Sequence, residues 1–313
     1  MTTKKSVVVL SISTKIRSVA KIPHVIPYQG SKRKLAPTIC AHFPAKVGTL
    51  YEPFAGSAAI TIHAAYHGLA NHFVIGDTLR PLVELHETII EKPATISDAY
   101  ERIWTAQPEG AKAIDYFLKI REQYNRERDS ERLLFLILRC VANAVRFAKN
   151  GNFSQSPDKR RRGTHPDRIR ESVFAVSKLL KGKTEFCCAD FATVSESASH
   201  DDLVYMDPPY QGTTDGADKR YFEQLDRERL IIRLREMTTR GVPFILSYDG
   251  QHGEKKYGED LPVDLHAYKM LVRVGRSTQG TLNGKEVITY ESIYLSHGLR
   301  APREEPQYSF ALM

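Results

Sequence analysis

Short apolar runs recur along this chain, and a helical hydrophobic pattern follows most of them. Apolar runs of about four to eight residues between turn-forming residues are typical of buried strands, and their alternation with helices indicates a parallel sheet. We therefore expect an α/β fold with a doubly wound, mostly parallel sheet. Segments near Val272 and Ile293 flank a polar stretch that contains glycine and predict an antiparallel hairpin at the sheet edge. The expected strands lie at residues 49–51, 72–75, 184–187, 203–206, 243–247 and 289–296.

The alternation stops between about residues 91 and 181, where the pattern is mostly helical. Ser130 is a candidate N-cap for a helix over residues 131–147, and a second helix is expected near residues 168–180. This stretch reads as an insertion into the sheet domain. The expected division is a flexible leader at residues 1–21, a sheet domain at 22–90 and 182–300, a helical insertion at 91–181 and a tail at 301–313.

The charge of the chain is concentrated in one segment. The formal net charge is +8, and residues 139–170 contain nine Lys or Arg and two Asp, a net of +7. Such a segment favours a polyanionic partner. The four cysteines show no CxxC spacing, which argues against a zinc site and for reduced thiols in a cytoplasmic-type protein. We expect no membrane span, because no apolar run reaches about 18 residues.

The apolar run at residues 203–206 is followed directly by Asp207, Pro208, Pro209 and Tyr210. Proline cannot donate to a strand ladder, so the strand ends there. In an open α/β sheet, the loop that leaves the carboxyl end of a strand faces the ligand crevice. The sequence therefore predicts an active site with a carboxylate, rigid carbonyls and an aromatic ring. A plain strand end followed by a Pro-Pro turn is the alternative.

These groups suit the methylation of an exocyclic amine on a planar base. The amino nitrogen of adenine is a poor nucleophile, because its lone pair is delocalised into the ring. The Asp207 carboxylate and the Pro208 carbonyl can each accept one of its N–H bonds, which localises the lone pair on the nitrogen. The Tyr210 ring can stack on the face of the base.

A second candidate site lies at residues 50–59, which read as a strand, a tight turn and a helix start. Gly56 lets the backbone approach a ligand closely. The segment lacks the GxGxxG pattern and a phosphate-binding lysine, so a phosphate ligand is disfavoured. Asp77 ends the next expected strand, where an acid can hold a ribose or cap a helix.

Two further segments carry candidate site residues. Asp190 ends the expected strand at 184–187 and can bind an adenine amino group, with Phe191 stacked beside it; an exposed loop acid is the alternative. The turn near Tyr28 and Lys32 would place both side chains over the same crevice, where Lys32 can pair with a ligand carboxylate. A surface lysine is the other reading.

Taken in this order, the segments resemble the Dam-like (D12 class, α group) adenine-N6 DNA methyltransferases over about residues 26–296. Residues 28–32 look like the family's N-terminal Tyr-x-Gly-(Gly/Ser)-Lys motif, and residues 52–57 look like its cofactor loop. Asp77 matches its ribose acid, and residues 207–210 match its catalytic motif. Two more segments, residues 143–153 and 284–288, also look like family segments.

The chain departs from the family pattern in two places. Ala58 stands where the family often has the second glycine of Gly-Ser-Gly, so one methyl group must be accommodated. Residues 154–157 replace the Asn-Val-Pro-Phe-Gly run of the Dam branch, so GATC is not assumed as the target.

The resemblance implies a Rossmann-like sheet of seven strands that binds S-adenosylmethionine, with a helical insertion that recognises duplex DNA. It implies a flipped-out target adenine, direct transfer without a covalent enzyme intermediate, and no metal. The implied catalytic residues are Asp207, Pro208, Pro209 and Tyr210. The implied cofactor-binding residues are Tyr28, Lys32, Glu52, Pro53, Phe54, Ala55, Gly56, Ser57, Asp77, Asp190, Phe191 and Asp207. The candidate DNA-binding residues are Arg146, Asn152, Gln155, Lys159, Arg160, Arg161 and Arg162.

Two other functions remain open from the sequence. A methyltransferase of the same fold can act on RNA or on a protein glutamine, although protein-directed enzymes typically have Asn where this chain has Asp207. A DNA-binding module with a decayed catalytic site is the other alternative, and the intact motif at residues 207–210 argues against it. We expect a monomer or weak dimer in the cytoplasm, associated with a prokaryotic nucleoid or encoded by a phage.

Overall fold

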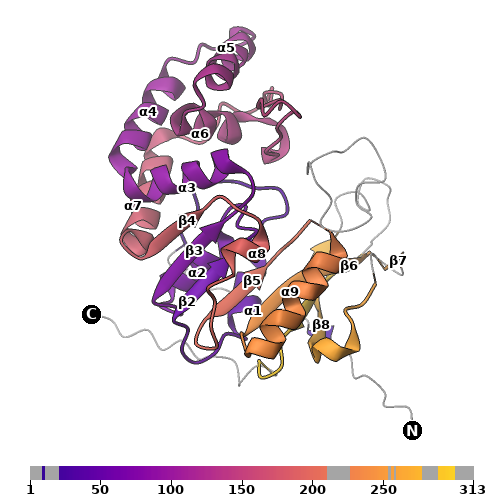
Figure 1. Cartoon of the computed structure of the whole chain (residues 1–313). Helices are drawn as coiled ribbons and strands as arrows, with labels where there is room; N and C mark the ends of the chain where they lie inside the picture. Colours follow the sequence, from indigo (N-terminus) through magenta and orange to yellow (C-terminus); the bar gives the residue numbers. More distant parts are fainter. Residues whose placement is uncertain are drawn as a thin grey trace.

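The computed structural model describes residues 9–10, 21–209, 226–252, 255–256, 259–276 and 288–299. Its strands join one sheet in the order β1-β8-β9-β6-β5-β2-β3-β4, with β7 paired to β6 (Figure 1). The strands are β1 (Val9–Leu10), β2 (Thr49–Glu52), β3 (His72–Gly76), β4 (Thr184–Cys187), β5 (Leu203–Met206), β6 (Phe244–His252), β7 (Lys255–Lys256), β8 (Tyr268–Arg276) and β9 (Ile288–Leu295).

The sheet is mostly parallel, as the sequence predicts. β4, β3, β2, β5 and β6 run parallel, and β9 pairs antiparallel with both β6 and β8. These seven strands form the main sheet, and the two-residue strands β1 and β7 add to it. The expected strands at 184–187 and 203–206 are confirmed to the residue, and the hairpin near Val272 and Ile293 is confirmed as β8 and β9.

Helices cover both faces of the sheet because successive strand residues point to opposite sides. In β5, Leu203 and Tyr205 belong to the core cluster that contains α1 and α2, whereas Val204 and Met206 belong to the cluster that contains α8 and α9. The helices are α1 (Ala36–Cys40), α2 (Ala59–Tyr66), α3 (Arg80–Glu91), α4 (Pro93–Thr105), α5 (Lys112–Glu127), α6 (Ser130–Arg139), α7 (Pro166–Leu180), α8 (Phe191–Val194) and α9 (Arg227–Arg240), with short 3-10 turns η1 (Lys32–Lys34), η2 (Val141–Asn143) and η3 (Val263–Leu265).

The helical segment expected between residues 91 and 181 is present as α4 to α7. In Figure 1, α4, α5 and α6 gather away from the sheet, and α3 and α7 lie between them and the strands. α7 contacts α2 and α3 as well as α4, so it links the two parts. The domain boundaries themselves stay a prediction.

Two details of the insertion were predicted wrongly. α6 ends at Arg139 rather than near residue 147, because the chain turns to an extended conformation at Cys140 and doubles back. The return is held by isolated bridges between Cys140 and Pro157 and between Phe147 and Phe153. The N-cap of α6 is Asp129 rather than Ser130, since the Asp129 carboxylate accepts the backbone N–H of Arg132 at 2.8 Å.

Several sequence predictions lie wholly or partly outside the described residues. They concern Tyr210, the family-like segment at 284–287, and the tail at 301–313. Of the leader at 1–21, Val9 and Leu10 are described as β1, which pairs in parallel with Leu271 and Val272 of β8. No helix in the described ranges has the length and apolar character needed to cross a membrane.

Candidate functional site

The candidate site is assembled at the carboxyl ends of three neighbouring strands. β3, β2 and β5 lie next to one another in the sheet and run parallel. The loop after β2 contains Gly56, β3 leads to Asp77, and β5 leads to Asp207. The topology therefore brings together three segments that lie far apart in the sequence, as the crevice rule for parallel sheets predicts.

The turn at Gly56 is fixed from three directions. Gly56 adopts a φ of +49°, and a Cβ at this position would lie 3.3 Å from the Tyr28 ring, so both the conformation and the space favour glycine. Its backbone N–H donates to Asp77 Oδ2 at 3.2 Å, and its carbonyl lies 2.8 Å from His86 Nε2. Ser57 Oγ lies 2.7 Å from Ser31 Oγ. The turn is thus tied to β3, α3 and the segment before η1.

Ala58 explains why the family often has glycine at this point. It is the N-cap of α2 and has φ +50° and ψ +42°, the left-handed conformation. A non-glycine residue pays about 1–2 kcal/mol for this conformation. Alanine in place of glycine at this fully buried position therefore costs backbone strain.

Glu52 is buried at the end of β2, and its side chain binds the backbone of the first turn of α2. Its two carboxylate oxygens accept the backbone N–H groups of Ile60 at 3.4 Å and Thr61 at 2.8 Å. Burial raises the pKa of Glu52 to about 7, and these hydrogen bonds only partly offset the effect. The side chain is 3% exposed, so its geometry supports a role in shaping the loop. Cofactor contact by Glu52 stays a prediction.

Asp77 shapes the same loop and is not a helix cap. Its Oδ1 accepts the N–H of Leu79 at 3.0 Å and its Oδ2 accepts the N–H of Gly56. The N-cap of α3 is Leu79, which removes the helix-cap alternative. Burial raises the pKa of Asp77, and the backbone hydrogen bonds from Leu79 and Gly56 counteract it. Ribose binding by Asp77 stays a prediction.

Asp190 caps α8 and faces α9. Its Oδ1 accepts the N–H groups of Ala192 and Thr193, both at 3.0 Å, and its Oδ2 lies 3.0 Å from an Arg229 nitrogen. The hydrogen bond from Thr193 and the pairing with Arg229 hold the pKa of Asp190 below its usual value. This carboxylate is ionised and partly exposed, so one of its oxygens can still face a ligand.

An aromatic pair joins two of the predicted cofactor segments. The Phe54 and Phe191 rings are stacked, with centroids 5.5 Å apart and planes at 22°. Phe191 is buried, whereas Phe54 in the loop after β2 keeps partial exposure. Among the other loop residues, Pro53, Ala55 and Ser57 are buried, so Phe54 and Gly56 are the parts of the loop best placed to meet a ligand.

Lys32 lies at the centre of the site and pairs with two carboxylates of the protein itself, and its pairing with a ligand carboxylate stays a prediction. Its Nζ lies 2.7 Å from Asp207 Oδ1 and 2.8 Å from Oδ2, and 3.3 Å from Glu291 Oε1. Burial alone would lower the pKa of Lys32, but Asp207 and Glu291 outweigh it and raise the pKa. The lysine is therefore charged and only 6% exposed, which excludes the surface-lysine alternative.

Glu291 is the residue that the sequence reasoning missed. It is the one charged residue of β9, and its side chain is 14% exposed. The available signal was an acid within a strand expected to be buried. Pro208, which follows Asp207, is buried, and Pro209 is partly exposed.

The basic segment divides into exposed side chains and side chains that hold the loop. Lys159 and Arg160 are exposed. Arg161 is also exposed, but it donates to Asp158 at 2.8 Å and to the carbonyl of Cys140 at 2.9 Å. Arg162 donates to the carbonyl of Gln107 at 2.6 Å, and its guanidinium lies 4.9 Å from the centroid of the Trp104 ring. Of the four predicted phosphate contacts, two are therefore engaged within the protein.

The three predicted base-reading residues lie in the loop that follows α6. Arg146 and Gln155 are partly exposed, and the Gln155 side chain accepts the backbone N–H of Ser156 at 3.0 Å. Asn152 accepts a hydrogen bond from Arg128 at the end of α5. DNA contact by these residues stays a prediction.

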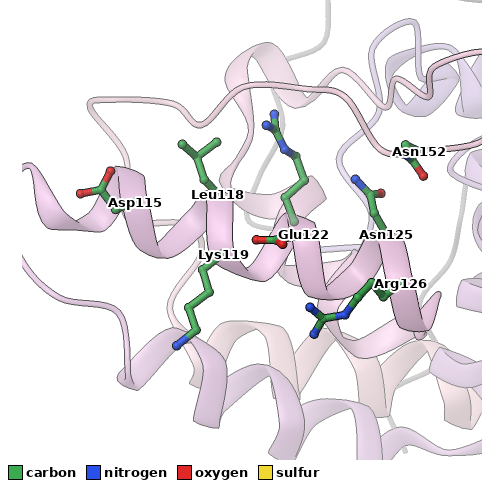
Figure 2. Close-up of a pocket in the computed structure, with 8 residues that line it drawn as sticks. Asp115, Leu118, Lys119, Glu122, Asn125, Arg126 and Asn152 are labelled. Atoms are coloured by element: carbon green, nitrogen blue, oxygen red, sulfur yellow. The ribbon is translucent and has the colours of Figure 1, made fainter.

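A pocket of about 700 Å³ lies along α5, away from the strand ends (Figure 2). Its lining mixes acids, bases and amides from one helix face with Asn152 of the loop. α5 also anchors that loop, because Asn125 exchanges two hydrogen bonds with the Phe153 backbone and Arg121 donates to the Gln155 carbonyl. The pocket therefore lies where α5 supports this loop. It does not contain the acids and the glycine turn that meet at the strand ends.

The described residues contain no group of three or more His, Cys, Asp or Glu side chains arranged to hold a metal ion. The sheet order, the glycine turn after β2 and the acids after β3 and β5 together define a Rossmann-like fold of the methyltransferase type. The chain belongs to the D12 class N6 adenine-specific DNA methyltransferases, whose family model matches residues 28–277.

The names of similar proteins agree with this family assignment. The chain is 24% identical to the DNA N-6-adenine-methyltransferase of Escherichia phage P1 over 64% of this chain and 26% of the relative. It is 26% identical to the type II methyltransferase M.FokI of Planomicrobium okeanokoites over 74% of this chain and 36% of the relative. A DNA adenine methylase of Vibrio cholerae is 24% identical over 74% of this chain and 83% of its own length. The chain thus spans about a quarter to a third of the first two relatives and most of the third.

Proposed function

We propose that this chain is a site-specific DNA adenine-N6 methyltransferase that uses S-adenosylmethionine and acts on a flipped-out adenine in duplex DNA. One observation carries the proposal: Asp207 and Pro208 leave the sheet beside the glycine turn at Gly56, and Lys32 holds the Asp207 carboxylate there. The segments after β2 and β5, which the reaction must bring together, are neighbours at the carboxyl ends of adjacent strands.

The residues present suit S-adenosylmethionine. The Gly56 turn allows close approach, and the stacked Phe54 and Phe191 rings offer an apolar wall for a planar adenine. Asp77 and Asp190 would hold the ribose and the adenine amino group of the cofactor. The carboxyl-rich edge also favours a positively charged sulfonium. When bound, S-adenosylmethionine supplies an electrophilic methyl group.

The chain's own groups would prepare the target amine. The Asp207 carboxylate and the Pro208 carbonyl each accept an N–H bond of the extruded adenine, which directs the nitrogen lone pair away from the ring. Extrusion costs a few kcal/mol, which binding in the pocket and stacking offset. Tyr210 is the proposed stacking partner. This chemistry needs no metal and no covalent bond to the enzyme.

The insertion would bind the duplex. Lys159 and Arg160 are the best-exposed candidates for phosphate contacts, which position DNA without reading its sequence. Arg146, Asn152 and Gln155 have suitable donors for base edges. We further propose that the protein acts as a monomer or weak dimer in the cytoplasm, on nucleoid or phage DNA.

The test is methyl transfer by the purified chain from labelled S-adenosylmethionine to duplex DNA, with RNA and protein substrates as controls. Asp207→Ala should lower the rate by about 10²- to 10⁴-fold and leave DNA binding intact. Mapping N6-methyladenine in DNA from expressing cells would identify the target. Normal turnover by the variant would remove Asp207 from the mechanism, and labelling of RNA or protein alone would replace the proposed substrate.

A further inference from the structure

Glu291 is a half-buried acid of the site that no recognised motif contains. It lies on β9, opposite Gly250 of β6 and Val272 of β8. Its Oε1 lies 3.3 Å from Lys32 Nζ, the same nitrogen that contacts both carboxylate oxygens of Asp207. One ammonium group is therefore shared between two acids that come from different strands.

This sharing matters for the proposed reaction. Asp207 has to accept an N–H bond from the incoming base while the Lys32 ammonium contacts both of its oxygens. A carboxylate has about four acceptor sites, so there is room for both partners. A nearby cation nevertheless stabilises the ionised carboxylate and makes it a weaker base. A second acid beside the cation opposes that effect.

We propose that Glu291 is a positioning residue, which holds part of the Lys32 ammonium so that the Asp207 carboxylate remains a strong acceptor for the adenine amino group. The proposal rests on the methyltransferase activity proposed above. Glu291 acts through Lys32 and is not itself a catalytic residue.

Within the part of the chain that the structure describes, the charged and titratable groups around Asp207 come from four elements. Lys32 belongs to η1, Glu52 to β2, Tyr205 to β5 and Glu291 to β9. The pKa of Asp207 is raised to about 6, mainly by burial; Glu291 adds to the rise and Lys32 opposes it. Loss of the Glu291 charge therefore lowers the pKa of Asp207. The ionised form then persists to lower pH, but it is a weaker acceptor.

A purely structural role for Glu291 makes a different prediction. If the carboxylate only anchored the segment before α1 to the sheet, its removal would lower stability and leave the pH dependence of the rate unchanged. The pH profile separates the two roles, because only a change in the charge around Asp207 moves it.

The decisive variant is Glu291→Gln in the full chain, which removes the charge and keeps the shape. Single-turnover methyl transfer to duplex DNA is measured at saturating cofactor and DNA between about pH 5 and pH 9. We expect a plateau rate lower by roughly tenfold to a hundredfold, with little change in KM for S-adenosylmethionine. The acidic limb should move to lower pH by about one unit. Glu291→Asp, which retains the charge, should restore part of the rate.

Two comparisons make the result specific. In a Lys32→Met background, Glu291→Gln should add little, because its partner is gone. Asp202→Asn is the matched control, since Asp202 is also a buried acid but lies before β5 and bonds to Thr49 and Ser199. This control should lower thermal stability and leave the pH profile unchanged.

The proposal is overturned if Glu291→Gln keeps the wild-type plateau and pH profile, or if its effect is equally large without Lys32. A stability loss alone, with an unmoved profile, also overturns it in favour of the structural role. Failure of the proposed function is recognised separately, because the wild-type chain would then transfer no methyl group to DNA.

Discussion

The strand ends and the insertion use charge in opposite ways. At the strand ends, Lys32, Asp207 and Glu291 are mostly buried and depend on one another. In the insertion, Lys159 and Arg160 are exposed. Buried charges change one another's protonation, whereas exposed charges interact weakly and are screened by salt. The first region should therefore respond to pH, and the second should respond to ionic strength.

The largest expected effect tests the pH response of the buried region. In Glu52→Gln, the amide oxygen can still accept an N–H bond at the start of α2. The pKa of Glu52 is raised in the folded protein to about 7, so wild-type stability falls as pH rises from about 4.5 to 7. The variant lacks this fall, and its stability advantage should grow by about 3 kcal/mol over that range.

The measurement is denaturant unfolding at a series of pH values. Glu185→Gln is the matched control, because Glu185 is an exposed glutamate on β4, a parallel strand of the same sheet. The control should follow the wild-type curve throughout. Parallel stability curves for Glu52→Gln and wild type would show that buried charge does not govern this region.

The next effect tests the salt response of the insertion and the division within its basic run. Lys159→Gln with Arg160→Gln should weaken DNA binding and reduce the slope of log affinity against log salt by roughly 1.8. Arg161→Gln with Arg162→Gln should instead lower the free energy of unfolding by about 1–2 kcal/mol, because both arginines bond to backbone carbonyls.

Binding titrations at several salt concentrations and thermal unfolding of both double variants provide the readout. The two pairs carry the same change in charge, so each is the other's control. Equal salt slopes for the two pairs would contradict the division between exposed and loop-holding arginines.

The smallest effect concerns a position where charge plays no part. Ala58→Gly removes the strain of a left-handed alanine and should stabilise the protein by about 0.5–1 kcal/mol. Ala65→Gly, within the same helix α2, should destabilise it by about 1 kcal/mol. Thermal unfolding of both variants checks the sign. A loss of stability in Ala58→Gly would mean that chain entropy outweighs the strain.

The sequence predicted the parallel strands well because their boundaries have simple physical causes. β5 is an apolar run between two acids and a proline pair, so the sequence defines both where the strand begins and where it ends. The turn at Gly56 and the acids at Asp77 and Asp207 follow from the same strand ends. Their convergence could be predicted because parallel strands share one edge.

The end of α6, the role of Glu291 and the bonding of the basic run depend on contacts between residues far apart in the sequence, which the sequence pattern does not reveal. Val141 and Ala144 continue the apolar spacing of α6. The chain nevertheless turns at Cys140, because Cys140 forms an isolated bridge with Pro157 of the returning segment. Glu291 is the one charged residue of β9, and its presence there is explained only by its contact with Lys32, which lies far away in the sequence. The charge of the basic run likewise gave no sign of which arginines bond within the protein.

The pairing of Lys32 with Glu291 joins residues that lie 259 positions apart in the sequence. A ribosome that has made the first two hundred residues has released the lysine and its glycine turn, but not the strand that completes the cluster. Until β9 pairs with β6 and β8, Asp207 has only part of its electrostatic surroundings. The proposed methyl transfer should therefore begin only after translation has passed β9, and a truncation before residue 291 should leave Lys32 and Asp207 without the acid that completes their cluster.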